Sequence, residues 1–146
     1  MQSRMSLPRA AQDAQQAVLA LHAYVEGCGL EHSLLELVKI RASQINGCAF
    51  CLHMHVRDAR KAGVSEDKLA VLPAWRESPL FSERERAALE WTEALTLIAT
   101  NHVPDAVYEA ARAQFSEAEL GKLTVAIGLI NTWNRIAIAF RYVHPA

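Results

Sequence analysis

Residues 47–55 of the chain read GCAFCLHMH, and the most reactive side chains of the sequence are gathered there. If this stretch is helical, Cys48, Cys51 and His55 share one face, because they are three and four residues apart. A thiol pair with an imidazole one turn away is typical of a reactive cysteine. The thiolate is the nucleophile, and a helix N-terminus or a nearby imidazole favours its formation.

Helical periodicity continues on both sides of this stretch, with apolar residues recurring every three or four positions. Capping boxes at Ser82/Glu85 and Ser116/Glu119 mark two helix starts, and Ser65 is a candidate cap for a third. The sequence predicts an all-α protein, a single domain over residues 1–146 folded as a bundle of about seven helices. The expected helices cover residues 8–26, 31–43, 48–63, 65–72, 82–99, 104–114 and 116–140.

Within this bundle, residues 31–63 are expected to form the helical hairpin that carries the cysteine motif. Apolar residues surround most of the 31–43 segment, which predicts an inner helix. Residues 72–81 contain two prolines and are expected to be a loop, and the last helix is expected to kink around residues 131–134. The three tryptophans, Trp75, Trp91 and Trp133, are expected in the core or at an interface.

The composition narrows the function classes. Fifteen basic and sixteen acidic residues give a net charge of −1, which argues against a nucleic-acid-binding protein and against a polybasic membrane anchor. The longest apolar run, residues 123–130, is far shorter than the about 20 residues of a membrane-spanning helix. No apolar signal segment is recognisable near the N-terminus, so a cytoplasmic protein without membrane contact is expected. Three cysteines do not form a secretory disulfide framework.

Glu36 is the second candidate for chemistry, because it lies between Leu35 and Leu37 in the expected inner helix. A short turn joins this helix to the cysteine helix, so Glu36 is able to face His55 and to bond it directly or through water. A chain of Glu, His and Cys would pass a proton and fix the imidazole tautomer. The alternative is a surface Glu that pairs with Lys39 or Arg41, and the spacing leaves both open.

Glu36, the Cys48/Cys51 pair and His55 together resemble the alkylhydroperoxidase AhpD core of the carboxymuconolactone decarboxylase-like family. That motif has a Glu twelve residues before a CxxC pair and a His four residues after its second Cys, and all intervals match here. Flanking segments are also similar to those of the short, single-core members: residues 45–48, 58–63, 74–76, 85–95 and 131–135.

The resemblance implies an all-α fold, assembly into a homo-oligomer (trimer or hexamer) and activity as a thiol peroxidase. Cys51 would be the peroxidatic thiol, Cys48 the resolving thiol, and His55 and Glu36 the proton relay. The substrate would be a hydroperoxide, and an external dithiol, of the lipoyl type in the well-studied members, would be the reductant. The cycle requires no organic cofactor and no metal.

One departure from the family pattern concerns Phe50, which stands where those members carry a second His directly before the second Cys. The proton relay is therefore expected to have one histidine fewer, and the substrate pocket is expected to be more apolar. The true lactone decarboxylases of the family lack the cysteine pair, which argues against decarboxylation by this chain.

Other interpretations of the motif remain. Cys48, Cys51, His53 and His55 offer four zinc ligands, although His53 points away on a helix and no second ligand pair follows. A redox-sensing or metal-binding module would use the same CxxC and His, and an interaction scaffold would need neither. Physical arguments alone do not decide which cysteine is the attacking thiol. The helix dipole favours Cys48, and the adjacent imidazole favours Cys51.

Overall fold

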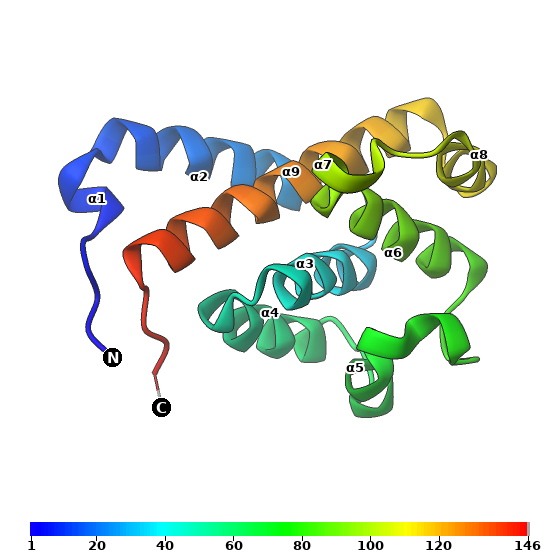
Figure 1. Cartoon of the computed structure of the whole chain (residues 1–146), viewed down its shortest axis with the longest axis horizontal. Coiled ribbons are helices and arrows are strands. Elements are labelled where there is room, and N and C mark those ends of the chain that lie inside the picture. The colour runs from blue at the N-terminus through cyan, green and yellow to red at the C-terminus, as the bar shows by residue number, and fades with distance from the viewer. Residues whose placement is uncertain (146) are drawn as a thin grey trace.

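The computed structural model describes residues 1–145, and all regular secondary structure in that range is helical (Figure 1). The all-α prediction is therefore confirmed. The α-helices are α1 (Leu7–Ala10), α2 (Gln12–Glu26), α3 (His32–Asn46), α4 (Ala49–Lys61), α5 (Glu66–Val71), α6 (Glu83–Thr96), α7 (Ile98–Asn101), α8 (Asp105–Gln114) and α9 (Glu117–Phe140). A 3₁₀ helix, η1 (Leu72–Glu77), follows α5.

The described residues contain more helices than the expected seven or so because two predicted helices are divided. The first is interrupted at Ala11, whose φ of −150° and ψ of 75° leave the helical region and separate α1 from α2. The other is interrupted at Leu97 (φ −102°, ψ 29°), between α6 and α7. The segment predicted as a loop contains η1, in which Pro73 occupies the first turn, where its missing N–H costs nothing.

The helix starts follow the local capping signals. Ser82 and Ser116 each form a complete capping box with the Glu three residues later, and the Ser65 side chain accepts the N–H of Lys68. Between α3 and α4, Gly47 has a φ of +71°, a left-handed conformation that glycine adopts without a Cβ penalty. This tight turn reverses the chain and places α4 against α3.

Helix α3 is the inner helix of the bundle, as its sequence predicts. It contacts α4, α6, α9 and η1, and its apolar side chains Leu35, Leu37 and Val38 are almost completely buried. Figure 1 shows α2 and α9 running antiparallel along one side of the molecule, with the α3–α4 hairpin on the other side of α9. The cysteine motif, at the start of α4, therefore packs against α9.

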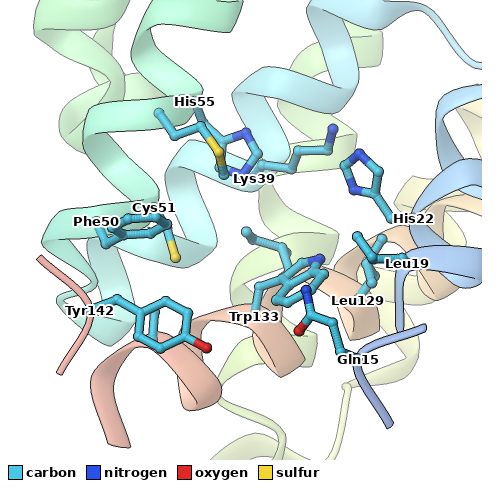
Figure 2. Close-up of a pocket in the computed structure, with 13 residues that line it drawn as sticks. Gln15, Leu19, His22, Lys39, Phe50, Cys51, His55, Leu129, Trp133 and Tyr142 are labelled. Carbon is cyan, nitrogen blue, oxygen red and sulfur yellow. The ribbon is translucent and has the colours of Figure 1, made fainter. Parts of the chain in front are cut away.

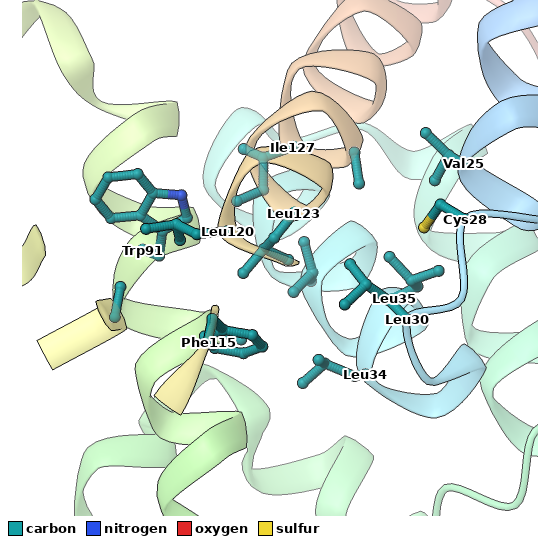
Figure 3. Close-up of a cluster of buried hydrophobic side chains, with 14 of the residues drawn as sticks. Val25, Cys28, Leu30, Leu34, Leu35, Trp91, Phe115, Leu120, Leu123 and Ile127 are labelled. Atoms are coloured by element: carbon teal, nitrogen blue, oxygen red, sulfur yellow. The ribbon is translucent and has the colours of Figure 1, made fainter. Parts of the chain in front are cut away.

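The largest cluster of buried apolar side chains joins α2, α3, α6, α8 and α9 (Figure 3). Leu35, Leu123 and Ile127 form its centre, and Trp91 and Phe115 close it on the side of α6 and α8. Trp91 is in the core, as expected. The burial of this cluster is the main source of stability for the helical framework, since isolated helices of these lengths are marginal in water.

Helix α9 is continuous through residues 131–134, so the expected kink is absent. The two asparagines there direct their side chains to other parts of the protein. The Asn46 amide donates to Asn131 Oδ1 and Asn134 Oδ1 at 3.0 and 2.9 Å, and the Asn134 amide donates to Ser43 Oγ at 3.0 Å. These bonds join α9 to the end of α3, and they satisfy Asn134 in its completely buried position.

By length and apolar composition alone, α9 would also pass as a membrane-spanning helix. In the fold, however, Leu120, Leu123, Ile127 and Ile130 on this helix are buried against other helices. The apolar character of α9 is thus explained by its place in the bundle, where it contacts α2, α3, α4, α6 and α8.

The two ends of the described chain lie together (Figure 1). The Arg4 N–H donates to the Phe140 carbonyl at 2.9 Å, and the Leu7 N–H donates to Tyr142 Oη at 3.2 Å. These bonds hold the end of α9 and the segment after it beside the N-terminal residues and the start of α1. As a result, Tyr142 is positioned next to the cysteine motif.

Candidate redox site

The α3–α4 hairpin brings Glu36 and His55 together. Glu36 Oε2 lies 2.9 Å from His55 Nδ1, and both side chains are buried, with 6% and 4% of their residue surface exposed. The direct contact that the sequence left open is therefore present. Nineteen residues of chain separate the two groups, and the tight turn at Gly47 makes the contact possible.

The charge of Glu36 determines which ring nitrogen of His55 donates a proton to it. Burial by itself would raise the pKa of the Glu36 carboxyl, but the hydrogen bond from His55 and the positive charges of His55 and Lys39 lower it. Glu36 is thus a carboxylate at neutral pH and can only accept hydrogen bonds. His55 Nδ1 must donate the proton in this bond, so Nε2 is the ring nitrogen that is left to act as a base.

Lys39 belongs to the same buried cluster. Its Nζ lies 2.9 Å from Glu36 Oε1 and 2.5 Å from Glu26 Oε1, and only 3% of the residue is exposed. Burial alone would lower the pKa of the Lys39 ammonium, but the charges and hydrogen bonds of Glu36 and Glu26 raise it. Glu36 therefore bonds His55 through one oxygen and Lys39 through the other. It pairs with Lys39 as a buried side chain, so the alternative of a surface Glu is wrong.

The two cysteines are joined as a disulfide, with their Cα atoms 5.4 Å apart. Cys48 is the N-cap of α4, and its sulfur accepts the Cys51 N–H at 3.3 Å. Cys51 lies one turn before His55 on the same helix. Only 1% of each cysteine is exposed, so a reagent reaches Cys51 through the cavity that it lines. Cys28, the third cysteine, is buried and free.

A cavity of about 320 Å³ opens beside Cys51 and His55 (Figure 2). Its walls are mostly apolar and come from α2, α3, α4, α9 and the segment that follows α9. The apolar lining includes Leu19, Phe50, Met54, Leu129, Trp133 and Tyr142. Phe50 packs edge-on against Tyr142, with ring centroids 5.6 Å apart. Phe50 thus supplies apolar wall directly beside the cysteines.

Several residues of this site were not identified from the sequence. Lys39 carried a weak signal, because it follows Glu36 by three residues on a largely apolar helix. Trp133 lies in the family-like segment 131–135, but its place in the cavity was not predicted. Gln15 and Tyr142 carried no signal, since they reach the cavity from α2 and from the segment after α9. Of the three tryptophans, Trp75 and Trp91 are buried in the core and Trp133 lines the cavity.

The four donors of the zinc interpretation are not gathered at one point. His53 Nδ1 lies 3.2 Å from His144 Nδ1 on the surface, while His55 faces Glu36. Within residues 1–145, another set of possible ligands does converge: Glu36, His55 and Asp58. Both Glu36 oxygens, however, already bond Lys39 and His55, so an ion at that point would have to displace these bonds.

The sequence is similar to a known protein family and to bacterial proteins. The family model described as "Carboxymuconolactone decarboxylase family" matches residues 12–94, a segment that contains Glu36, both motif cysteines and His55. The uncharacterized protein YdfG of Bacillus subtilis is 40% identical over 139 residues, which is 95% of each chain. The uncharacterized protein YnjA of Escherichia coli is 37% identical over 102 residues, 70% of this chain and 56% of YnjA.

Among solved structures, a protein of unknown function from Agrobacterium tumefaciens, proposed to be the antioxidant defence protein AhpD, superposes with a TM-score of 0.97. It is 50% identical, and the match covers 99% of both chains. The debrominase Bmp8 superposes with a TM-score of 0.80 at 19% identity, over 92% of this chain and 73% of that chain. At that identity the likeness to Bmp8 concerns the fold alone.

Proposed function

This chain belongs to the carboxymuconolactone decarboxylase family, and we propose that it is a thiol-dependent peroxidase that reduces organic hydroperoxides through Cys48 and Cys51. One observation carries this proposal. Cys51 and His55 line the same apolar cavity, and Glu36 holds Nδ1 of His55 so that Nε2 is left as a base. A nucleophile, a base oriented by a third group, and an adjacent apolar binding space are the parts that the reaction needs.

In the first step, His55 Nε2 takes the proton of the reduced Cys51 thiol, and the imidazolium is stabilised by the Glu36 carboxylate. The thiolate attacks the terminal oxygen of the hydroperoxide and the O–O bond breaks. The alkoxide leaves as an alcohol with the proton that His55 returns. Cys51 is then a sulfenic acid, oxidised by two electrons, and the hydroperoxide has been reduced by the same two electrons.

In the second step, the Cys48 thiol displaces the hydroxyl of the sulfenic acid. The disulfide forms and one water leaves, so the dithiol and the hydroperoxide yield a disulfide, an alcohol and water. The short Cα–Cα distance of 5.4 Å means that the pair can join without a large movement of the backbone.

The third step needs an external dithiol, and we propose one of the lipoyl type. Its thiolate attacks Cys51 from the cavity, and Cys48 departs as a thiolate that the Cys51 N–H and the start of α4 stabilise. The second thiol of the reductant then releases Cys51. Cytoplasmic reductants would maintain this cycle. The family resemblance further suggests a homo-oligomer, for which the exposed Leu21 and Tyr24 of α2 offer apolar contact surface.

This assignment gives Cys51 the peroxidatic role and Cys48 the resolving role. Cys51 lines the cavity together with His55, whereas Cys48 does not line it. The N-cap position of Cys48 favours its thiolate, but that property serves a leaving group as well as a nucleophile. Access and the adjacent base therefore favour Cys51 as the attacking thiol.

The test is an intact mass of the reduced protein before and after one equivalent of cumene hydroperoxide. A loss of about two mass units that disappears in Cys48→Ser and in Cys51→Ser is expected for the disulfide. Cys48→Ser should instead trap a sulfenic acid on Cys51, detectable with dimedone. Cys28→Ser is the matched control and should behave like the wild type. Peroxidase turnover that persists in Cys51→Ser would refute the assignment.

A redox-sensing module would form the same disulfide, so turnover distinguishes it from an enzyme. With dihydrolipoamide in excess, a peroxidase consumes many equivalents of hydroperoxide per protein and keeps a constant rate. A sensor is oxidised once and is reduced slowly. A single turnover under these conditions would favour the sensor over the peroxidase.

A further inference from the structure

Among the described residues, two buried side-chain polar atoms have no hydrogen-bond partner: His55 Nε2 and Gln15 Oε1. Both residues line the same cavity. More than nine in ten buried polar groups in proteins are paired, so two exceptions at one cavity call for a common explanation. The mechanism proposed above accounts for His55 and leaves Gln15 without a role.

Gln15 approaches the cavity from α2, across the space from Cys51 and His55 on α4 (Figure 2). Its labelled neighbours there are the apolar Leu19, Leu129 and Trp133. The unpartnered atom is a carbonyl oxygen, which needs a donor, and the leucine side chains have none. The Trp133 indole N–H is a donor, but it does not bond Gln15 Oε1. A polar group in such surroundings is costly unless a ligand supplies the missing hydrogen bond.

We propose that the cavity takes a compact, neutral hydroperoxide that carries a hydroxyl group at the end remote from the peroxide, and that Gln15 binds this hydroxyl. The identity of the ligand as a hydroperoxide rests on the function proposed above. The hydroxyl group fits the amide in either orientation, because it both donates and accepts. Gln15 is then a specificity-determining residue, and His55 acts at the other end of the molecule.

The remaining features of the wall support this ligand class. About 320 Å³ is near the lower end of the range for small-molecule sites, which suits an aromatic ring or a branched alkyl body. Phe50, Trp133 and Tyr142 provide aromatic surface for such a body. The Lys39 ammonium in the wall already bonds two carboxylates, which favours a neutral ligand over an anionic one.

The test uses the oxidised protein and two stable alcohols, so that it does not depend on peroxide chemistry. The first is 2-phenyl-2-propanol, the alcohol that reduction of cumene hydroperoxide would give, and the second is its para-hydroxy derivative. Calorimetric titration should show that the para-hydroxy compound binds the wild type about tenfold more tightly, since the buried Gln15 Oε1 stays without a partner when the other compound is bound. Gln15→Leu, which keeps a good helix former in α2, should abolish this preference.

Gln16→Leu, at the exposed neighbouring position of α2, is the matched control and should retain the preference. Equal affinities in the wild type, no binding of either alcohol, or a preference that persists in Gln15→Leu would overturn the proposal. A protein that shows the Gln15-dependent preference but does not reduce hydroperoxides would contradict the peroxidase function alone. Peroxidase activity without the preference would contradict only the role of Gln15.

Discussion

Replacement of Lys39 by Met tests the buried charge cluster beneath the cavity. Methionine keeps an unbranched side chain of similar length and removes the ammonium, so Glu36 loses one of its two partners and Glu26 loses its bond to Lys39. Removal of one partner of a buried ion pair costs about 3–5 kcal/mol of unfolding free energy. Glu36 retains His55, and the Glu26 side chain is 35% exposed, which favours the lower limit, about 3 kcal/mol.

The pH dependence separates the loss of charge from a loss of packing. The folded-state pKa of Glu36 is lowered, so the stability that Glu36 contributes is present above its unfolded pKa and is lost as pH falls through the folded value. The folded-state pKa of Lys39 is raised, so its contribution is present at neutral pH and is lost as pH rises through the folded value. In Lys39→Met, protonation of the carboxylates relieves the uncompensated charge. The difference between wild type and variant should therefore shrink from pH 7 to pH 4.

Urea unfolding, followed by circular dichroism at several pH values, gives these free energies. Lys68→Met is the matched control. Lys68 Nζ bonds both Glu85 oxygens at 2.8 Å, but the Lys68 side chain is 21% exposed, so the expected loss is about 1 kcal/mol or less. A loss in Lys39→Met that is equal at pH 4 and pH 7, or no larger than that of Lys68→Met, would refute the argument.

Three further substitutions test the site and the fold. Glu36→Gln keeps an acceptor for His55 Nδ1 but removes the charge that stabilises the imidazolium. Disulfide formation driven by peroxide, measured by stopped flow, should therefore slow about 100-fold. An unchanged rate would exclude Glu36 from the relay. Phe50→His should lower the ratio between the rates at which cumene hydroperoxide and hydrogen peroxide are reduced about tenfold, because the cavity wall loses apolar surface. An unchanged ratio would mean that Phe50 does not contact the substrate. Asn134→Leu should reduce the urea-unfolding free energy by about 2 kcal/mol, since Ser43 Oγ loses a donor and the Asn46 amide loses an acceptor. A loss below about 0.5 kcal/mol would show that these amide bonds are replaceable.

The parts of the fold that the sequence predicted correctly depend on local chemistry. Ser82 and Ser116 begin helices because their side chains reach backbone N–H groups within the same turn. The breaks at Ala11 and Leu97 have no such signal, since both residue types favour helices. At Ala11, the break accompanies long-range bonds between the N-terminal segment and the end of α9, including that of Leu7 to Tyr142. Such contacts are not encoded in any short stretch of sequence.

In the site, too, the features set by local sequence were predictable and those set by long-range packing were not. The contact between Glu36 and His55 was predictable as one of two alternatives, because a short turn connects their helices. The sequence did not reveal that Glu36 is buried and pairs with Lys39 as well, since it does not show how deeply Lys39 is buried. Gln15, Trp133 and Tyr142 become neighbours of Cys51 only through the packing of α2 and α9 on the hairpin. The cysteine motif is local, whereas the cavity beside it is assembled from distant segments.

The buried chain of bonds from Glu26 through Lys39 and Glu36 to His55 is difficult to explain as a stabilising device. Apolar residues of similar volume often replace such ion pairs without loss of stability. The bonds along the chain satisfy the Lys39 ammonium, both Glu36 oxygens and His55 Nδ1, and the chain ends at His55 Nε2, which has no protein partner and belongs to a residue that lines the cavity. A purely structural cluster has no reason to leave that atom unsatisfied. A cluster that orients a base toward a substrate must leave it free, and the arrangement is therefore better explained by chemistry at Cys51 than by folding.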